Sequence, residues 1–109
     1  MIVTHTKIVA SDITRAINEA EQTIQSGCND TFYRAVDKAL GLILRHKLDY
    51  PENATVTRIE LLEQLEAKND PSIETIKSHY AICDQARYGL GISEADQLTL
   101  INELRQVKL

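Results

Sequence analysis

The stretch that decides the fold is residues 30–48, DTFYRAVDKALGLILRHKL. Its apolar residues recur every three or four positions, the spacing that puts side chains on one face of an α-helix. They form the broadest apolar stripe in the chain: Phe32, Tyr33, Val36, Leu40, Ile43, Leu44 and Leu48. Asn29 or Asp30 can cap the first N–H groups, and the basic run at 45–47 suits the negative end of a helix dipole. We predict a helix over 30–47 at the centre of the domain.

Two further helices are predicted on either side of this one. The first spans about residues 11–25 and stops at Gly27, and because Val9 continues its apolar stripe, a start near Thr6 stays open. The second follows a loop and begins with TRIE at 57–60. In that motif the Thr and Glu side chains can satisfy each other's backbone donors.

The last two helices also follow clear start signals. Asp70 can cap one of them, and Pro71 suits its first turn, where the missing N–H is not needed. Gly89 ends this helix, and Ser93 opens the other with a weaker capping motif. The inward residues predicted for the three shorter helices are Ile59, Leu62 and Leu65 or Leu61; Ile73, Ile76, Tyr80, Cys83 and Ala86 or Arg87; and Leu98, Ile101, Leu104 or Arg105, and Val107.

The expected fold is therefore all-α: a compact bundle of four to five helices with short loops. A chain of 109 residues, 43% hydrophobic and 26% charged, fits one globular domain over 1–109. Residues 1–10 are expected to be a poorly ordered or extended N-terminal segment.

Composition argues against several classes of function. The net charge is −4 and the sequence contains no Trp, so nucleic acid is an unlikely partner. No apolar run approaches the ~18 residues of a membrane span, so we expect no membrane insertion by this segment. Cys28 and Cys83 stand far apart without a CxxC motif and read as reduced cytosolic thiols, although a single disulfide stays open.

No catalytic or metal-binding motif emerges from the sequence. His5, His46 and His79 are scattered, and His79 with Cys83 offers two possible ligands where zinc normally has three or four. The plainer interpretation puts Cys83 in the core and leaves His79 half-exposed. His46 lacks the surrounding motif of a phosphotransfer histidine and suits a helix end. We therefore expect no enzyme, no cofactor and no metal.

Two segments resemble a known family. Residues 30–40, DTFYRAVDKAL, resemble the FYxAxxxAL helix in the C-terminal region of BatD (Bacteroides aerotolerance) proteins. Residues 83–88, CDQARY, resemble that family's later run of cysteine, acidic residue, x, alanine, arginine and tyrosine. The chain departs from the pattern at Gly41 and Gly89. Its ARYG, followed by a Ser-Glu-x-Asp helix start, is similar to a related uncharacterised helical domain that ends transglutaminase-like bacterial membrane proteins.

The resemblance implies a function. BatD-like proteins are membrane-anchored parts of bacterial aerotolerance and stress systems, encoded with MoxR-type AAA ATPases and von Willebrand factor A proteins. By resemblance this chain is a non-catalytic, cytoplasmic protein-interaction domain, excised from an anchored protein or a soluble paralogue. The alternative is a structural helical module or a homodimerisation domain with no dedicated partner, and the oligomeric state stays open.

The candidate interaction or helix-locking residues are Tyr33, Arg34, Asp37, Arg87 and Tyr88. Arg34 and Asp37 are three positions apart and can pair on one helix. Arg87 is expected to reach a carboxylate on the long helix, with Asp37 as the candidate, and so to lock two helices together. The plainer interpretation makes Tyr33 part of the core and leaves Arg34 and Asp37 on the surface.

Overall fold

A computed structural model of the chain describes residues 9–26, 29–51, 55–86, 88–89 and 93–107. Within these ranges the chain forms five α-helices. They are α1 (Ala10–Ser26), α2 (Asn29–Lys47), α3 (Arg58–Ala67), α4 (Ile73–Ala86) and α5 (Glu94–Gln106). The all-α prediction is confirmed, and no helix of the described part is both long and apolar enough to cross a membrane.

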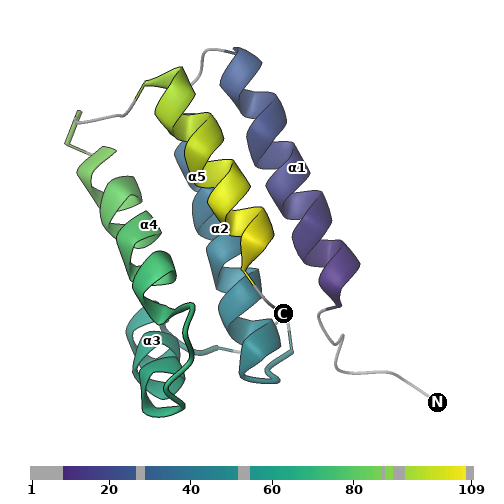
Figure 1. Cartoon of the computed structure of the whole chain (residues 1–109), viewed down its shortest axis with the longest axis vertical. Helices are drawn as coiled ribbons and strands as arrows, with labels where there is room; N and C mark the ends of the chain where they lie inside the picture. Colours follow the sequence, from purple (N-terminus) through teal and green to yellow (C-terminus); the bar gives the residue numbers. More distant parts are fainter. Residues whose placement is uncertain (1–8, 27–28, 52–54, 87, 90–92, 108–109) are drawn as a thin grey trace.

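The central position predicted for the long helix is confirmed. Helices α1, α3 and α4 all pack against α2, while α5 packs against α1 and α3 packs against α4. Figure 1 shows α5 in front of α2, between α1 and α4. Six residues of the predicted apolar stripe are buried in α2, and the seventh, Leu48, directly follows the helix and packs against the core. The broad stripe therefore contacts several neighbouring helices.

The predicted capping contacts at Thr57 and Ser93 are confirmed, whereas α4 begins at Ile73, so Pro71 lies in the turn before this helix. The Thr57 hydroxyl accepts a 3.2 Å hydrogen bond from the Glu60 backbone N–H, and the Ser93 hydroxyl accepts one of 3.2 Å from Asp96. The Asp70 carboxylate accepts a 2.8 Å bond from the Ser72 N–H. Gly89 has a φ of 81°, the left-handed backbone that suits a helix stop without a Cβ.

Two inward predictions are wrong, and helix geometry explains both. Ile59 is 65% exposed because Leu61 and Leu65 set the buried face of α3, and Ile59 lies about 200° around the helix from Leu61. Leu98 is 44% exposed for the same reason, since it lies about 200° from the buried Leu100.

The prediction for His79 is wrong, whereas one of the two alternatives for the inward position of α5, Leu104 or Arg105, is confirmed. His79 is 1% exposed, whereas a half-exposed side chain was predicted. Arg105 is exposed and makes hydrogen bonds of 3.2 and 3.0 Å to the Glu21 carboxylate and 2.8 Å to the Asn18 amide oxygen, so it ties α5 to α1 from the surface. Leu104 fills the inward position instead.

Several sequence predictions fall outside the described residues. They concern the extended segment before Val9, a helix start near Thr6, the stop at Gly27, the state of Cys28 and the role of Arg87. Within the described part, α1 begins at Ala10.

Candidate functional site

The candidate site is a polar pocket enclosed by three helices, named here the α2–α3–α4 pocket. Its volume is about 490 Å³. Five lining residues come from α2, two from α3 and one from α4: Asp37, Lys38, Gly41, Leu42, Arg45, Arg58, Leu61 and Tyr80. Charged and aromatic side chains from separate helices therefore converge on one hollow.

The α2 wall is built by residues spaced four apart. Asp37, Gly41 and Arg45 follow one another at successive helical turns and so share one face. Arg45 Nη1 donates a 3.3 Å hydrogen bond to the Gly41 carbonyl oxygen. A Cβ at Gly41 would lie 3.1 Å from that Nη1 atom. The glycine, unfavourable inside a helix by about 1 kcal/mol relative to Ala, makes room for the arginine to fold back along α2.

Arg45 has no carboxylate partner among the described residues. Its Nη2 donates to the Val56 carbonyl oxygen at 3.5 Å, the outer limit of a hydrogen bond. Its Nε is buried and has no hydrogen-bond acceptor in the described part of the chain. Arg45 is thus a partly buried cation held only by backbone oxygens, in a chain whose net charge is −4.

Arg58 on the opposite wall is paired with a carboxylate. Its Nη1 and Nη2 each donate a 3.2 Å hydrogen bond to one oxygen of Asp84 on α4. The hydrogen bond to Asp84 raises the pKa of Arg58 above its ordinary value. The guanidinium carbon also lies 4.6 Å from the centre of the Tyr80 ring, a cation–π distance. Arg58 therefore joins α3 to α4 and shapes the pocket wall.

Tyr80 contributes a neutral hydroxyl to the same pocket. The side chain is 5% exposed, and burial raises the pKa of the phenol well above its ordinary value. The hydroxyl makes no hydrogen bond to any described residue. Its oxygen is not among the buried unsatisfied atoms of the described chain, so it can bond to solvent or to a bound molecule.

The pocket chemistry suits recognition of an anion. Lys38, Arg45 and Arg58 bring positive charge, and the Tyr80 hydroxyl can donate a hydrogen bond. Among the described residues of the lining there is no nucleophile beside a general base. Across the described residues there is also no group of three His, Cys, Asp or Glu placed to hold a metal ion.

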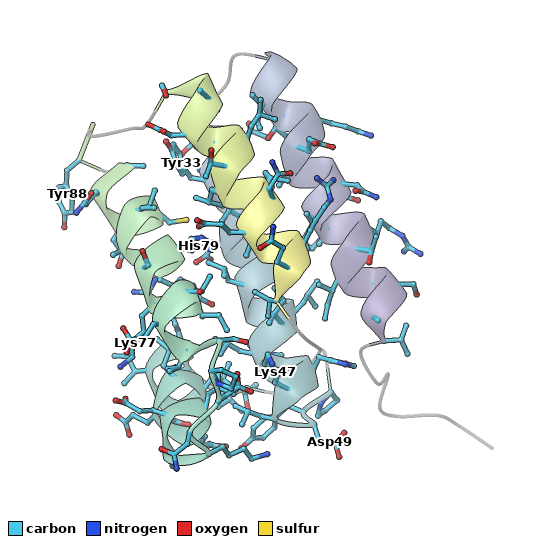
Figure 2. The ribbon with its side chains drawn as sticks, in the orientation of Figure 1. Tyr33, Lys47, Asp49, Lys77, His79 and Tyr88 are labelled. Carbon is cyan, nitrogen blue, oxygen red and sulfur yellow. The ribbon has the colours of Figure 1, made fainter. Side chains whose placement is uncertain are left out.

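The predicted site residues are dispersed, and Asp37 alone among those described lines the pocket. Tyr33 is core at 7% exposure and meets Phe32 edge to face, with ring centres 5.1 Å apart. Tyr88 is 84% exposed and points away from the bundle at the end of α4 (Figure 2). Arg87 lies outside the described residues, so a bond from Arg87 to Asp37 stays a prediction.

The pairing predicted for Arg34 is wrong. Arg34 Nε lies 3.1 Å from an Asp30 carboxylate oxygen, and no ion pair joins Arg34 to Asp37 within the described chain. A glutamate or aspartate placed four residues before a cation is the better helical arrangement, and Asp30 occupies that position. Both side chains are more than 70% exposed, so the pair contributes little to stability.

Sequence reasoning missed most of the pocket: Gly41, Arg45, Arg58 and Tyr80. A local signal was present, because Gly41 stands midway between an acid and an arginine on one helical face. The Arg58–Asp84 pair had no local signal, since its members are 26 positions apart in sequence.

A second polar pair lies between α4 and α5. His79 Nε2 is 2.8 Å from a carboxylate oxygen of Glu103, and His79 lies between the two helices in Figure 2. Its Nδ1 is buried with no partner in the described part of the chain. Because a carboxylate oxygen accepts, Nε2 is the donor of this hydrogen bond to Glu103. The carboxylate explains how a histidine is accommodated in the core.

Comparison of the chain with protein-family models, curated proteins and solved structures gives no significant match. A function is therefore argued from the chemistry of the pocket and from the resemblance carried by residues 30–40 and 83–88.

Proposed function

We propose that the domain is a non-catalytic, cytoplasmic protein-interaction module of a BatD-like aerotolerance or stress system. Its partners would be a MoxR-type AAA ATPase or a von Willebrand factor A protein of that system. The observation that carries the proposal is Arg45, a cation that lines the pocket without a carboxylate partner among the described residues.

Arg45 fits a recognition role better than a stabilising one. Among the described residues its side chain bonds to the Gly41 and Val56 carbonyl oxygens alone, and its buried Nε has no acceptor there. An unsatisfied buried donor costs free energy. Nη1 and Nη2 each carry a second N–H that no described residue accepts, and these two groups can donate to a ligand in the pocket.

The same helix, α2, carries the family-like motif and supplies residues to the pocket lining. Residues 30–40 carry the FYxAxxxAL pattern and form the first part of α2, and this segment supplies Asp37 and Lys38 to the pocket lining. The apolar positions of the pattern, including Phe32 and Leu40, are core. The pattern thus accounts for the fold of α2 and leaves its polar side for a partner.

Affinity capture from the cells that encode the protein tests this function. The tagged full chain is the bait, and captured proteins are quantified by mass spectrometry against an unrelated helical bait. Enrichment of an AAA ATPase or a von Willebrand factor A protein supports the proposal. Failure to enrich either class under gentle lysis overturns it.

A second candidate is homodimerisation, in which a second copy would cover the Tyr88 side chain, 84% exposed in the single chain. Tyr33, also considered for this role, lies in the core and is not available to a second copy. Light scattering of the wild type and of Tyr88→Ser separates the cases. A wild-type dimer that becomes monomeric in Tyr88→Ser would support homodimerisation. A wild-type chain that stays monomeric at high concentration would rule homodimerisation out.

A further inference from the structure

We infer that the α2–α3–α4 pocket binds one carboxylate group of a partner peptide and that Arg45 receives it, an inference that rests on the proposed interaction function. The carboxylate belongs to an acidic side chain or to the C-terminus of the peptide.

Arg45 supplies the main recognition group. A guanidinium has five N–H donors, and Arg45 uses two of its nitrogens on backbone oxygens, one of them at the 3.5 Å limit. The remaining donors suit the two oxygens of a carboxylate, which an arginine can bind in a forked arrangement. The charge is not cancelled by an ion pair with any described residue.

Gly41 holds this group in place. Arg45 folds back along α2 until Nη1 reaches the Gly41 carbonyl oxygen, which keeps the guanidinium at the pocket wall. A Cβ at position 41 would lie 3.1 Å from Nη1, a tight contact that would shift the guanidinium slightly. The glycine therefore favours the observed position of the arginine.

The net charge of the pocket matches a single negative charge. Among the described residues, Lys38, Arg45 and Arg58 are positive, while Asp37 in the lining and Asp84 bound to Arg58 are negative, which leaves one positive charge. A dianionic phosphate would be opposed by the Asp37 carboxylate. A lone carboxylate at Arg45, two helical turns from Asp37, is compatible with this balance.

The Tyr80 hydroxyl and the pocket volume further restrict which chemical groups can bind. The Tyr80 hydroxyl, on a side chain 5% exposed, has no bond to a described residue and offers a neutral donor beside the arginines. A volume of about 490 Å³ holds a small group of roughly one or two side chains. Leu42 and Leu61 add apolar walls, which suit the carbon atoms of a peptide side chain.

Titration of isotope-labelled full chain by nuclear magnetic resonance tests the inference. The probes are three pools of short peptides whose flanking residues are randomised among non-acidic amino acids. One pool has a central glutamate and blocked ends, the second has glutamine in its place, and the third has no acidic side chain but a free C-terminal carboxylate. The amide signals of Gly41, Arg45 and Tyr80 should move with the first or the third pool and stay in place with the second.

Variants assign the effect to Arg45. Arg45→Gln should weaken binding about tenfold or more, the typical effect of removing a charge-assisted hydrogen bond. Arg34→Gln, on the same helix but outside the pocket, should bind as the wild type does. Gly41→Ala keeps the arginine yet displaces it, so it should also bind more weakly and serves if Arg45→Gln fails to fold.

The outcomes separate this inference from the proposed function. Equal shifts with the glutamine pool, no shift with any pool, or unchanged binding by Arg45→Gln and Gly41→Ala would overturn the carboxylate site. Capture of an AAA ATPase by the wild-type chain would stand independently of that result. Conversely, carboxylate binding without capture of either partner class would support the carboxylate site and overturn the proposed partners. Binding by the third pool only would assign the carboxylate to a peptide C-terminus.

Discussion

Arg58 on α3 donates two hydrogen bonds of 3.2 Å to the carboxylate of Asp84 on α4. Its guanidinium carbon also lies 4.6 Å from the centre of the Tyr80 ring. One side chain thus fixes the spacing of the two helices and the position of the pocket tyrosine. The helix lock expected from the sequence has the same chemistry, an arginine and a carboxylate, but the observed pair uses different residues.

Arg58→Ala should lower the free energy of unfolding by about 1–2 kcal/mol, the combined effect of a bidentate ion pair and a cation–π contact at a partly exposed site. Both side chains of the pair are about two-fifths exposed, which limits the effect. Urea denaturation measures the loss. A double-mutant cycle with Asp84→Ala should give a coupling of about 0.5–1 kcal/mol, and strictly additive losses would show that the pair is not coupled.

Gly41→Ala should raise stability while it weakens peptide binding. Alanine is favoured over glycine inside a helix by up to about 1 kcal/mol, and the 3.1 Å contact is with the flexible end of Arg45, which can move aside. Thermal unfolding and the peptide titration are measured on the same sample. Lower stability with unchanged binding would contradict the role given to Gly41.

Glu103→Ala should cost about 1–2 kcal/mol because it leaves the buried His79 Nε2 without an acceptor. Glu103→Gln should cost less, since its amide oxygen can still accept the same bond. Chemical denaturation of the two variants gives the comparison. Equal effects would mean that the bond does not hold His79 in the core.

The Lys47–Asp70 pair should make stability depend on acid pH. The two side chains are 8% and 20% exposed, and Lys47 Nζ lies 3.1 Å from the Asp70 carboxylate. Burial raises the pKa of Asp70, but hydrogen bonds from the Ser72 N–H and from Lys47 outweigh burial and leave the pKa below its ordinary value.

A lowered pKa in the folded state fixes the sign of this dependence. The stabilisation is fully present above the unfolded pKa of about 4 and is lost as the pH falls through the lower folded value. Asp70→Asn should therefore be less stable than the wild type at neutral pH, and the difference should shrink below about pH 4. Denaturation midpoints across that range measure it. A difference that stays constant with pH would contradict the assignment.

The helices were predictable because their signals are local. The stripe of residues 30–48 depends on spacing within one helix, and the Thr57 and Ser93 caps depend on atoms three residues apart. The inward face of α3 was harder to predict, because its apolar residues Ile59, Leu61, Leu62 and Leu65 spread around the helix instead of forming one narrow stripe. Ile59 was misplaced for this reason.

The site was less predictable because its contacts cross between helices. The burial of His79 follows from Glu103, 24 positions later, and Arg58 meets Asp84 across the α3–α4 pair. Neither contact can be read without knowing which helices are neighbours. The Gly41–Arg45 contact is local, and the unexplained glycine inside a strong helix was its signal.

Recognition of a partner through the α2–α3–α4 pocket is tested most directly by quantitative affinity capture with three baits: the wild-type chain, Arg45→Gln and Arg34→Gln. If the pocket binds the partner, the wild type and Arg34→Gln should enrich an AAA ATPase or a von Willebrand factor A protein equally. Arg45→Gln, folded by circular dichroism, should recover about a tenth as much or less. Equal recovery by Arg45→Gln would contradict the central claim that a partner is recognised through this pocket.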